Sequence, residues 1–298
     1  MKLAAIDLGS NACRLLINDV IIGTGDKVEF AKLALVRVPL RLGFDVFETG
    51  SISEGKIDKL VKTIKSYKYL LEVYEVEHLK ACATSAMRDA TNAKDIIATV
   101  KAETGIELEV ISGQDEASYI YDNHIAEHLN KLESYLYIDV GGGSTELTFF
   151  SDGRLVFKES FNIGTIRLLK NNVPDIAWEK MKDSLQAGIK GAPHVTCIGS
   201  GGNINKIFSL SKRKEGKPLT LEQLRTYYKE FSSINLEQRM QLYKLREDRA
   251  DVIIPALLIY INVMRWADAH EIYVPKIGLA DGLIQNLYEK VTGLSIVH

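Results

Sequence analysis

A strand–turn–strand pattern built around an aspartate and a glycine turn occurs twice in this chain, and this duplication is the strongest constraint on its fold. The stretch KLAAIDLGSNACRLLI at residues 2 to 17 runs a β-prone segment through Asp7 into a turn and then into a second β-prone segment. The stretch YLYIDVGGGSTELTFF at residues 135 to 150 does the same, with Asp139 matching Asp7 and Gly141 matching Gly9. A repeated D-x-G hairpin predicts two similar folding units.

The elements that follow each hairpin repeat in the same order. In the first half, hydrophobic periodicity predicts strands at 12–19, 28–38, 78–83 and 107–111, and helices at 53–74, from Asn92 to Gly105, and at 114–129. In the second half, it predicts strands at 134–140, 146–150, 154–161, 195–198 and 271–274, and helices at 175–190, after the glycines at 199–202, within 220–267 and at 281–291. Asn92 is expected to cap its helix, and Thr220 with Gln223 to form a capping box.

We therefore predict an α/β protein of two lobes. The first lobe comprises residues 1–120 and the second residues 121–298, with the terminal helix free to pack back on the first lobe. Two such lobes facing each other would form a cleft that receives one glycine turn from each side.

Composition excludes several classes of protein. A chain of 298 residues with 46% hydrophobic residues buries a substantial core. A formal net charge of -2 gives no electrostatic footprint for nucleic acid or an anionic membrane. The nearly apolar run 252–264 is interrupted by Pro255 and Asn262 and is too short to span a bilayer. Asp7 lies where a signal peptide would be apolar, so we expect the mature chain to begin here and to be cytoplasmic.

The cysteines also fit a reducing compartment. Cys13, Cys82 and Cys197 are odd in number and far apart, which favours isolated thiols over a disulfide framework or a zinc site.

The second hairpin turn has the chemistry of a phosphate site. Glycines at 141–143 let backbone N–H groups approach an anion, and the hydroxyls of Ser144 and Thr145 add donors. Asp139, with Glu146 as a second ligand, would hold Mg²⁺ or another divalent cation. The alternative is a flexible hairpin turn.

The matching turn of the first hairpin makes that alternative less attractive. Gly9, Ser10 and Asn11 become phosphate-binding candidates, and Asp7 becomes a third candidate metal ligand.

A third glycine turn, CIGSGGNINKIF at 197–208, runs from a strand into a helix, whose N-terminus favours an anion. It lacks the G-K-[ST] of a Walker loop, and Asn203 and Ile204 break the dinucleotide-binding spacing. The alternative is a turn for close strand–helix packing. Its phosphate-binding candidates are Gly199, Ser200, Gly201, Gly202 and Asn203.

With these turns in order, the chain resembles the exopolyphosphatase and guanosine pentaphosphate phosphatase family. The segments that carry the resemblance are AAIDLGSN (4–11), ATSAMRDATN (83–92), VISGQDEASYIY (110–121), YIDVGGGSTEL (137–147), NIGTIRL (162–168) and DRADVII (248–254). The resemblance implies two ribonuclease H-like lobes of the actin, sugar kinase and heat-shock ATPase superfamily, with an active-site cleft between them. It implies magnesium-dependent removal of terminal phosphates from inorganic polyphosphate or guanosine pentaphosphate, and a homodimer.

The resemblance also assigns roles to charged residues. Glu116 takes the position of the general base that activates water, whereas without the family it would read as a solvated glutamate at a helix start. Arg88 offers donors to phosphate, with a surface ion pair as the alternative. Arg14 and Arg249 are weaker phosphate-binding candidates, since each could equally face solvent.

Three departures from the family pattern bear on substrate preference. Asn203 stands where a hydroxyl residue is usual, Asp115 where a glutamate is common, and Ala280 in GLADG where an arginine is frequent. The chain resembles the short two-domain form, which implies shorter substrates or less processivity.

Three other functions compete with this interpretation. His124, Glu127 and His128 match the H-x-x-E-H signature of zinc proteases, although they equally suit an exposed helix face. A kinase of the same fold would phosphorylate a small molecule with ATP, and a nucleotide-driven filament or scaffold protein would also use two D-x-G turns.

Overall fold

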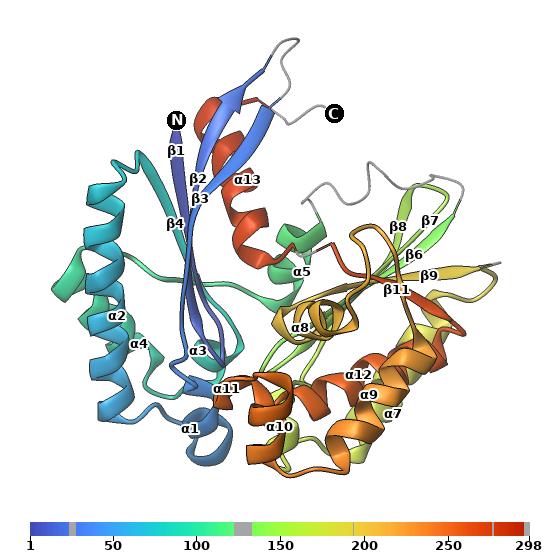
Figure 1. Cartoon of the computed structure of the whole chain (residues 1–298). Helices are drawn as coiled ribbons and strands as arrows, with labels where there is room; N and C mark the ends of the chain where they lie inside the picture. Colours follow the sequence, from blue (N-terminus) through green and yellow to red (C-terminus); the bar gives the residue numbers. More distant parts are fainter. Residues whose placement is uncertain (24–27, 122–132, 193, 276, 295–298) are drawn as a thin grey trace. The chain divides into compact units, whose positions relative to one another are not determined.

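The computed structural model describes residues 1–23, 28–121, 133–192, 194–275 and 277–294, which form two compact units (Figure 1). The first unit lies within Met1–Glu127 and Gly278–His298, and the second within His128–Ile277. The predicted boundary between residues 120 and 121 adjoins residues 122–132, which the structure does not describe, so it stays a prediction. The zinc-protease motif of His124, Glu127 and His128 also lies outside the described residues.

The first unit is built on a five-stranded mixed sheet in the order β3-β2-β1-β4-β5. Its strands are β1 (Lys2–Leu8), β2 (Cys13–Ile22), β3 (Val28–Val38), β4 (His78–Ala83) and β5 (Glu109–Val110). Its helices are α1 (Leu42–Thr49), α2 (Glu54–Val73), α3 (Ser85–Asp89), α4 (Ala93–Thr104), α5 (Gly113–Tyr121) and α13 (Leu279–Thr292). The central strand β1 is buried because apolar side chains point to both faces, and Leu283 and Ile284 of α13 join the core that covers one face.

The second unit is built on a six-stranded mixed sheet in the order β10-β11-β9-β6-β7-β8. Its strands are β6 (Ser134–Val140), β7 (Thr145–Ser151), β8 (Arg154–Phe161), β9 (Val195–Ser200), β10 (Leu219–Thr220) and β11 (Glu271–Tyr273). Its helices are α6 (Thr165–Leu169), α7 (Asp175–Gly188), α8 (Gly202–Ser211), α9 (Leu221–Ser232), α10 (Leu236–Tyr243), α11 (Glu247–Ala250) and α12 (Ile253–Trp266).

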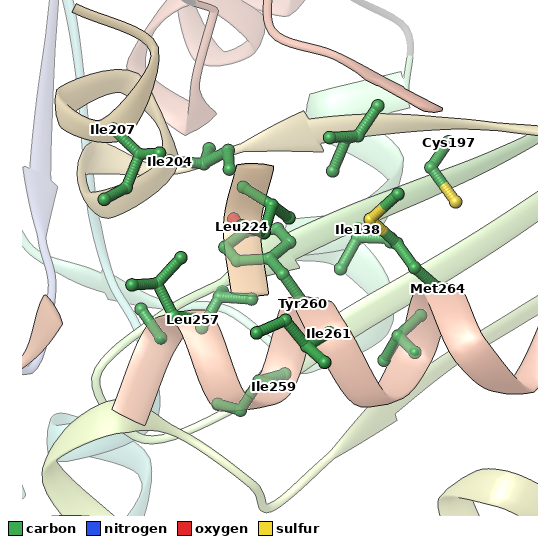
Figure 2. Close-up of a cluster of buried hydrophobic side chains, with 14 of the residues drawn as sticks. Ile138, Cys197, Ile204, Ile207, Leu224, Leu257, Ile259, Tyr260, Ile261 and Met264 are labelled. Atoms are coloured by element: carbon green, nitrogen blue, oxygen red, sulfur yellow. The ribbon is translucent and has the colours of Figure 1, made fainter. Parts of the chain in front are cut away.

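Helix α12 provides much of the core of the second unit. It is apolar on almost every face, as expected of a helix buried within a domain. Tyr260 and Met264 of this helix lie in one cluster with Ile138 of β6, Cys197 of β9 and Ile204 of α8 (Figure 2). This packing fixes the ends of β6 and β9, where the second and third glycine turns begin.

The two sheets confirm the predicted repeat of topology and the α/β fold class. In each unit the first strand pairs antiparallel with the second and parallel with the fourth, so β3-β2-β1-β4 corresponds to β8-β7-β6-β9. The predicted bounds of β3, β4, β6 and β8 agree with the structure. The predicted cleft between the lobes stays a prediction.

The helix caps agree with the sequence in part. Thr220 and Gln223 form the predicted capping box, since each backbone N–H donates to the other side chain, at 2.9 and 3.2 Å. Asn92 occupies the predicted N-cap position of α4, but its side chain makes no capping hydrogen bond. Its side chain accepts from Ile52 N at 3.0 Å and donates to Ile52 O at 2.8 Å, so a distant chain segment takes the groups that would have capped α4.

The predicted state of the cysteines is confirmed, because Cys13, Cys82 and Cys197 are all buried and free. Among the described residues, no helix has the length and apolar character that crossing a membrane requires.

Candidate functional site

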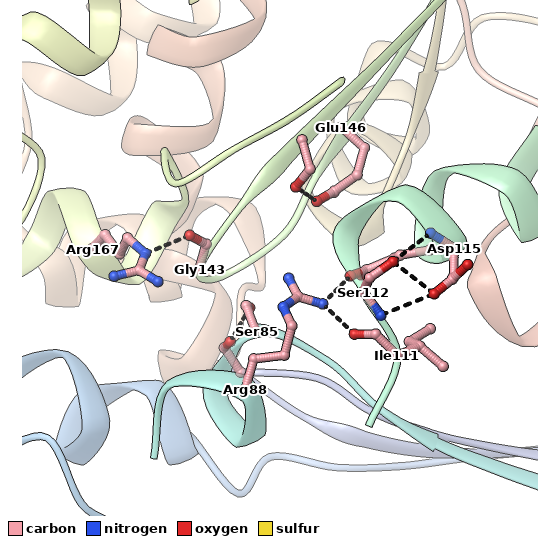
Figure 3. A network of polar contacts seen from close by, with 11 residues as sticks. Ser85, Arg88, Ile111, Ser112, Asp115, Gly143, Glu146 and Arg167 are labelled. Carbon is pink, nitrogen blue, oxygen red and sulfur yellow. Dashed lines mark hydrogen bonds and ion pairs between the residues drawn. The ribbon is translucent and has the colours of Figure 1, made fainter. Parts of the chain in front are cut away.

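In the second glycine turn, the carbonyl groups are hydrogen-bonded to the protein, whereas the backbone N–H groups are available to a ligand. Within the part of the chain that the structure describes, the N–H groups of Gly142, Gly143 and Ser144 make no hydrogen bond to the protein. The carbonyls from Gly141 to Gly143, by contrast, accept bonds from the start of α6. Arg167 contributes one of these bonds, from Nε to Gly143 O at 2.6 Å (Figure 3). A row of unbonded N–H groups with engaged carbonyls is the arrangement that binds an anion.

The chain covering this turn depends on Gly164, a residue not singled out in the sequence. A Cβ on Gly164 would lie 2.5 Å from backbone atoms of Gly142 and Gly143, so no side chain fits there. This close approach lets Thr165 N and Ile166 N donate to the turn, at 3.0 and 2.8 Å. The hydroxyl of Thr145 donates to Ile163 O at 2.5 Å, which leaves its lone pairs but not its proton for a ligand.

An acidic pair lies where this turn meets the sheet. Asp139 at the end of β6 is opposite Glu146 near the start of β7, and carboxylate oxygens of the two lie within 4.8 Å of each other. Ser200 Oγ donates to Asp139 and Ser160 Oγ to Glu146, both at 2.8 Å. Two facing carboxylates repel each other, and hard oxygen donors are the set that Mg²⁺ prefers. The residues therefore fit a divalent cation.

The third glycine turn lies against Asp139 of this pair. Gly201 has φ +107°, a conformation that L side chains rarely adopt, and a Cβ there would lie 3.1 Å from Asp139 Oδ1. The next residue, Gly202, begins α8 under Arg249, since its Cβ would lie 2.6 Å from a guanidinium nitrogen. Arg249 Nη1 donates to Asn203 Oδ1 at 2.7 Å. This contact combines a cation with a helix N-terminus, which favours an anion.

Tyr260 fixes the strand that leads into the third turn. Its hydroxyl donates a hydrogen bond to Ser200 O. Burial, and then the nearby charge of Asp139, raises the pKa of Tyr260 well above its usual value. The hydroxyl therefore stays protonated and remains a donor. Sequence reasoning missed Tyr260, because an apolar helix carries no signal for this role.

The first glycine turn has the same backbone design as the second. Gly9 N donates to Ala12 O at 3.0 Å, as Gly141 N donates to Ser144 O at 2.9 Å. Ser10 O and Asn11 O accept from backbone N–H groups at the start of α1, at 2.9 and 3.0 Å. The Ser10 hydroxyl lies 2.8 Å from that of Ser85 in α3, a contact not predicted from the sequence.

The charges at the first turn differ from those at the second. Asp7 is buried and accepts from Arg14 Nη1 at 2.5 Å, and the two residues are cross-strand partners. A predicted metal ligand and a predicted phosphate-binding arginine therefore neutralise each other. This ion pair makes Asp7 a less suitable metal ligand than Asp139 or Glu146.

Glu116 lies in the first turn of α5, where Arg88 holds it. Arg88 Nη1 donates to Ile111 O at 2.8 Å and contacts Glu116 Oε2 at 3.2 Å, and the Glu116 side chain is only 10% exposed. Arg88 is one of the residues labelled in Figure 3. The structure thus brings two predicted site residues together within the first unit.

Asp115 acts as a capping residue. Its carboxylate accepts from the N–H of Ser112 at 3.2 Å and from the Ser112 hydroxyl at 2.6 Å, while Asp115 N donates to Ser112 Oγ at 3.1 Å (Figure 3). This reciprocal capping stabilises the start of α5. Asp115, which stands where the family commonly has glutamate, therefore has a structural role beside the candidate base.

The family model described as the Ppx/GppA phosphatase family matches residues 21–291. The chain belongs to this family. Exopolyphosphatase 1 of Mycobacterium bovis is 27% identical over 319 residues, covering 100% of this chain and 91% of that protein. Membership makes the chain a phosphatase by family, and it favours hydrolysis over the kinase and filament alternatives.

Solved structures of Ppx/GppA proteins show the same fold. The Aquifex aeolicus family member is 26% identical with a TM-score of 0.74, covering 97% of this chain and 98% of that one. An exopolyphosphatase from Cytophaga hutchinsonii has a TM-score of 0.83 at 24% identity and covers 100% of both chains. This second likeness supports the two-lobed fold alone.

Proposed function

We propose that this chain is a magnesium-dependent phosphatase that hydrolyses the terminal phosphoanhydride bond of inorganic polyphosphate, with guanosine pentaphosphate as the alternative substrate. The observation that carries the proposal is the second glycine turn, where three N–H groups that make no hydrogen bond to any described residue lie beside the Asp139–Glu146 pair. The name of the mycobacterial relative, an exopolyphosphatase, supports the choice of polyphosphate.

The second unit would bind the phosphates. The N–H groups of Gly142, Gly143 and Ser144 would receive oxygens of one phosphate, and the start of α8 with Arg249 would receive those of another. Asp139 and Glu146 would hold the cation, which supplies positive charge against the phosphate oxygens when it is bound. These local positive groups suit a polyanion, although the whole chain has a net charge of -2.

Glu116 would act as the general base. It would accept a proton from a water whose oxygen attacks the terminal phosphorus, while the bond to the bridging oxygen breaks and the shortened chain leaves. Phosphoryl transfer needs little more from a protein than positioned charge and an oriented nucleophile. Arg88 fixes the Glu116 carboxylate, because its guanidinium contacts both that group and Ile111 O. Asp7, which is less suited to bind the metal, would instead hold Arg14 in place through their ion pair.

An assay of three substrates tests the proposal. The purified protein is incubated with polyphosphate, guanosine pentaphosphate or ATP, each with Mg²⁺ or with EDTA, and free phosphate is measured. Release from polyphosphate that EDTA abolishes is the expected result, and release from guanosine pentaphosphate alone would establish the alternative substrate. Phosphorylation of sugars by ATP, or ATP-dependent light scattering, would instead support the kinase or the filament.

Two further expectations accompany this function. The protein should form a homodimer, which gel filtration with light scattering measures. It should also fractionate with the cytoplasm.

A further inference from the structure

Helix α13 contacts the backbone of α5 at a glycine. A Cβ built on Gly282 would lie 1.7 Å from Tyr119 O and 2.5 Å from Tyr119 C, so nothing larger than hydrogen fits between the two helices. Figure 1 shows α13 beside α5 in the first unit. Such close approach of two backbones is a recognised reason for glycine within a helix.

The contact lies one helical turn from the candidate base. Tyr119 is three residues after Glu116 in α5, and positions three apart lie on neighbouring parts of one helix surface. A shift of the α5 backbone at Tyr119 therefore moves Glu116 as well. The base has little freedom to compensate, because Arg88 contacts both Glu116 Oε2 and Ile111 O.

A partly buried polar bridge reinforces the same contact. Lys80 of β4 donates from Nζ to Tyr119 OH at 2.7 Å and to Asn286 Oδ1 at 2.8 Å, and its ammonium lies 4.2 Å from the centre of the Tyr119 ring. Asn286 is one turn after Gly282 in α13. Lys80 thus joins the central sheet, α5 and α13 at one point.

Helix α13 is itself packed against the sheet through buried apolar side chains. Leu283 and Ile284 are fully buried among residues of β1 and β2, and Ala280, where the family often has arginine, is also buried in this cluster. The helix is therefore a rigid surface against which α5 is placed.

We propose that Gly282 is a positioning residue for catalysis. Its lack of a side chain lets the backbones of α5 and α13 approach closely, this approach sets the position of Glu116, and Lys80 stabilises the contact. The inference rests on the proposed function, since it takes Glu116 as the base. It adds a dependence of catalysis on a glycine and a lysine distant in sequence from the glycine turns.

The test compares Gly282→Ala with Gly55→Ala, a matched control whose added Cβ meets nothing within 4 Å. A displacement of about 1 Å can cost about 100-fold in rate. We expect polyphosphatase kcat to fall 10-fold or more in Gly282→Ala, KM to change less than about 3-fold, and Gly55→Ala to match the wild type. Hydrogen exchange should quicken in residues 113–121 and not in α2.

Lys80→Met provides a milder variant should Gly282→Ala fail to fold. It removes the bridge and leaves the glycine contact intact, so we expect a several-fold fall in kcat with the same local change in exchange. Wild-type kcat in folded Gly282→Ala, or in Lys80→Met where the first does not fold, would overturn the proposal.

A Glu116→Gln background separates positioning from general damage. If Gly282 and Lys80 act through Glu116, their substitutions should lower kcat little further once the base is gone, because effects of residues that act as a unit are not additive. Equal losses with and without Glu116 would refute the positioning role. Should Glu116→Gln itself retain wild-type turnover, the proposed function fails, and hydrogen exchange still decides whether Gly282 sets the position of α5.

Discussion

Asp139 and Glu146 are directly opposite each other in the β6–β7 hairpin, and the corresponding pair of the first unit is Asp7 and Arg14. The two hairpins therefore share a backbone design and differ in charge. The first contains an ion pair that balances itself. The second brings two carboxylates together near three N–H groups that, among the residues the structure describes, make no hydrogen bond; this arrangement favours a cation and an anion.

Replacing one carboxylate of this pair should abolish the response to Mg²⁺. A ligand that binds the folded state alone stabilises it by RT ln(1 + [L]/Kd), so the melting temperature of the wild-type protein should rise as Mg²⁺ is added. Asp139→Asn should lose that shift, and in EDTA it should be slightly more stable than the wild type because the repulsion with Glu146 is gone. Asp152→Asn, in the exposed turn after β7, is the control. A full Mg²⁺ shift in Asp139→Asn would remove the metal site from this pair.

Arg167 should be needed for the shape of the second glycine turn. It is buried, and its Nε donates to Gly143 O. Lysine lacks the planar fork that makes this bond, so Arg167→Lys should lower the free energy of unfolding by about 1–3 kcal/mol and weaken substrate binding. Urea unfolding and KM measure the two effects. The exposed Arg154→Lys serves as the control, and equal behaviour of the two variants would contradict the role.

Long periodic segments were predictable from the sequence, and short ones were not. β3, β4, β6 and β8 alternate or run apolar over six or more residues, which is enough to define their bounds. Helices α3 and α6 have five residues each, too few to show a helical period. Yet α3 contains Arg88 and α6 contains Arg167. The hydrophobic periodicity of the sequence therefore did not predict the two short helices that contain these arginines.

Contacts between distant segments were also hidden from the sequence. Asn92 has the residue type of a helix cap, but its side chain pairs with Ile52. Nothing in the sequence distinguishes Gly164 from an ordinary loop glycine, and only the structure shows its close approach to the second turn. Arg167 lies in NIGTIRL, a segment that supported the family resemblance, so it could have been proposed as a site residue from that signal alone.

Gly201→Ala should impair function beyond its effect on stability. Both Gly201 and Gly191 have positive φ, at +107° and +88°, so alanine at either position strains the backbone at a cost of about 1–3 kcal/mol. Only at Gly201 does the new Cβ also press on Asp139 and Val140 O. Phosphatase activity at a temperature where both variants are folded should fall in Gly201→Ala and persist in Gly191→Ala. Equal activities would show that the third turn tolerates a side chain.

The buried thiols predict a loss of stability at alkaline pH. Burial raises the pKa of Cys82 from 9.0 to about 12 and raises the pKa values of Cys13 and Cys197 as well. The folded state thus keeps protons that the unfolded state releases above pH 9. The contribution of the thiols to the free energy of unfolding is fully present below pH 9. It falls as the pH rises toward 12, by about 1.4 kcal/mol per pH unit for each thiol.

Alkylation and unfolding measure this effect. Iodoacetamide at pH 9 should leave all three thiols of folded protein unmodified and label all three in urea, and the urea midpoint should fall between pH 8.5 and 10.5. Rapid labelling of folded protein, or a midpoint that does not change with pH, would contradict the burial of these groups.

The turnover of Glu116→Gln on polyphosphate tests the central claim most directly. Glutamine keeps the size of the side chain and cannot accept the proton of an attacking water, so kcat should fall about 100-fold or more. Polyphosphate binding, measured by calorimetry in the presence of Mg²⁺, should remain within a few-fold of wild type, because the proposed phosphate contacts belong to the second unit. Turnover near the wild-type value in this variant would contradict the account.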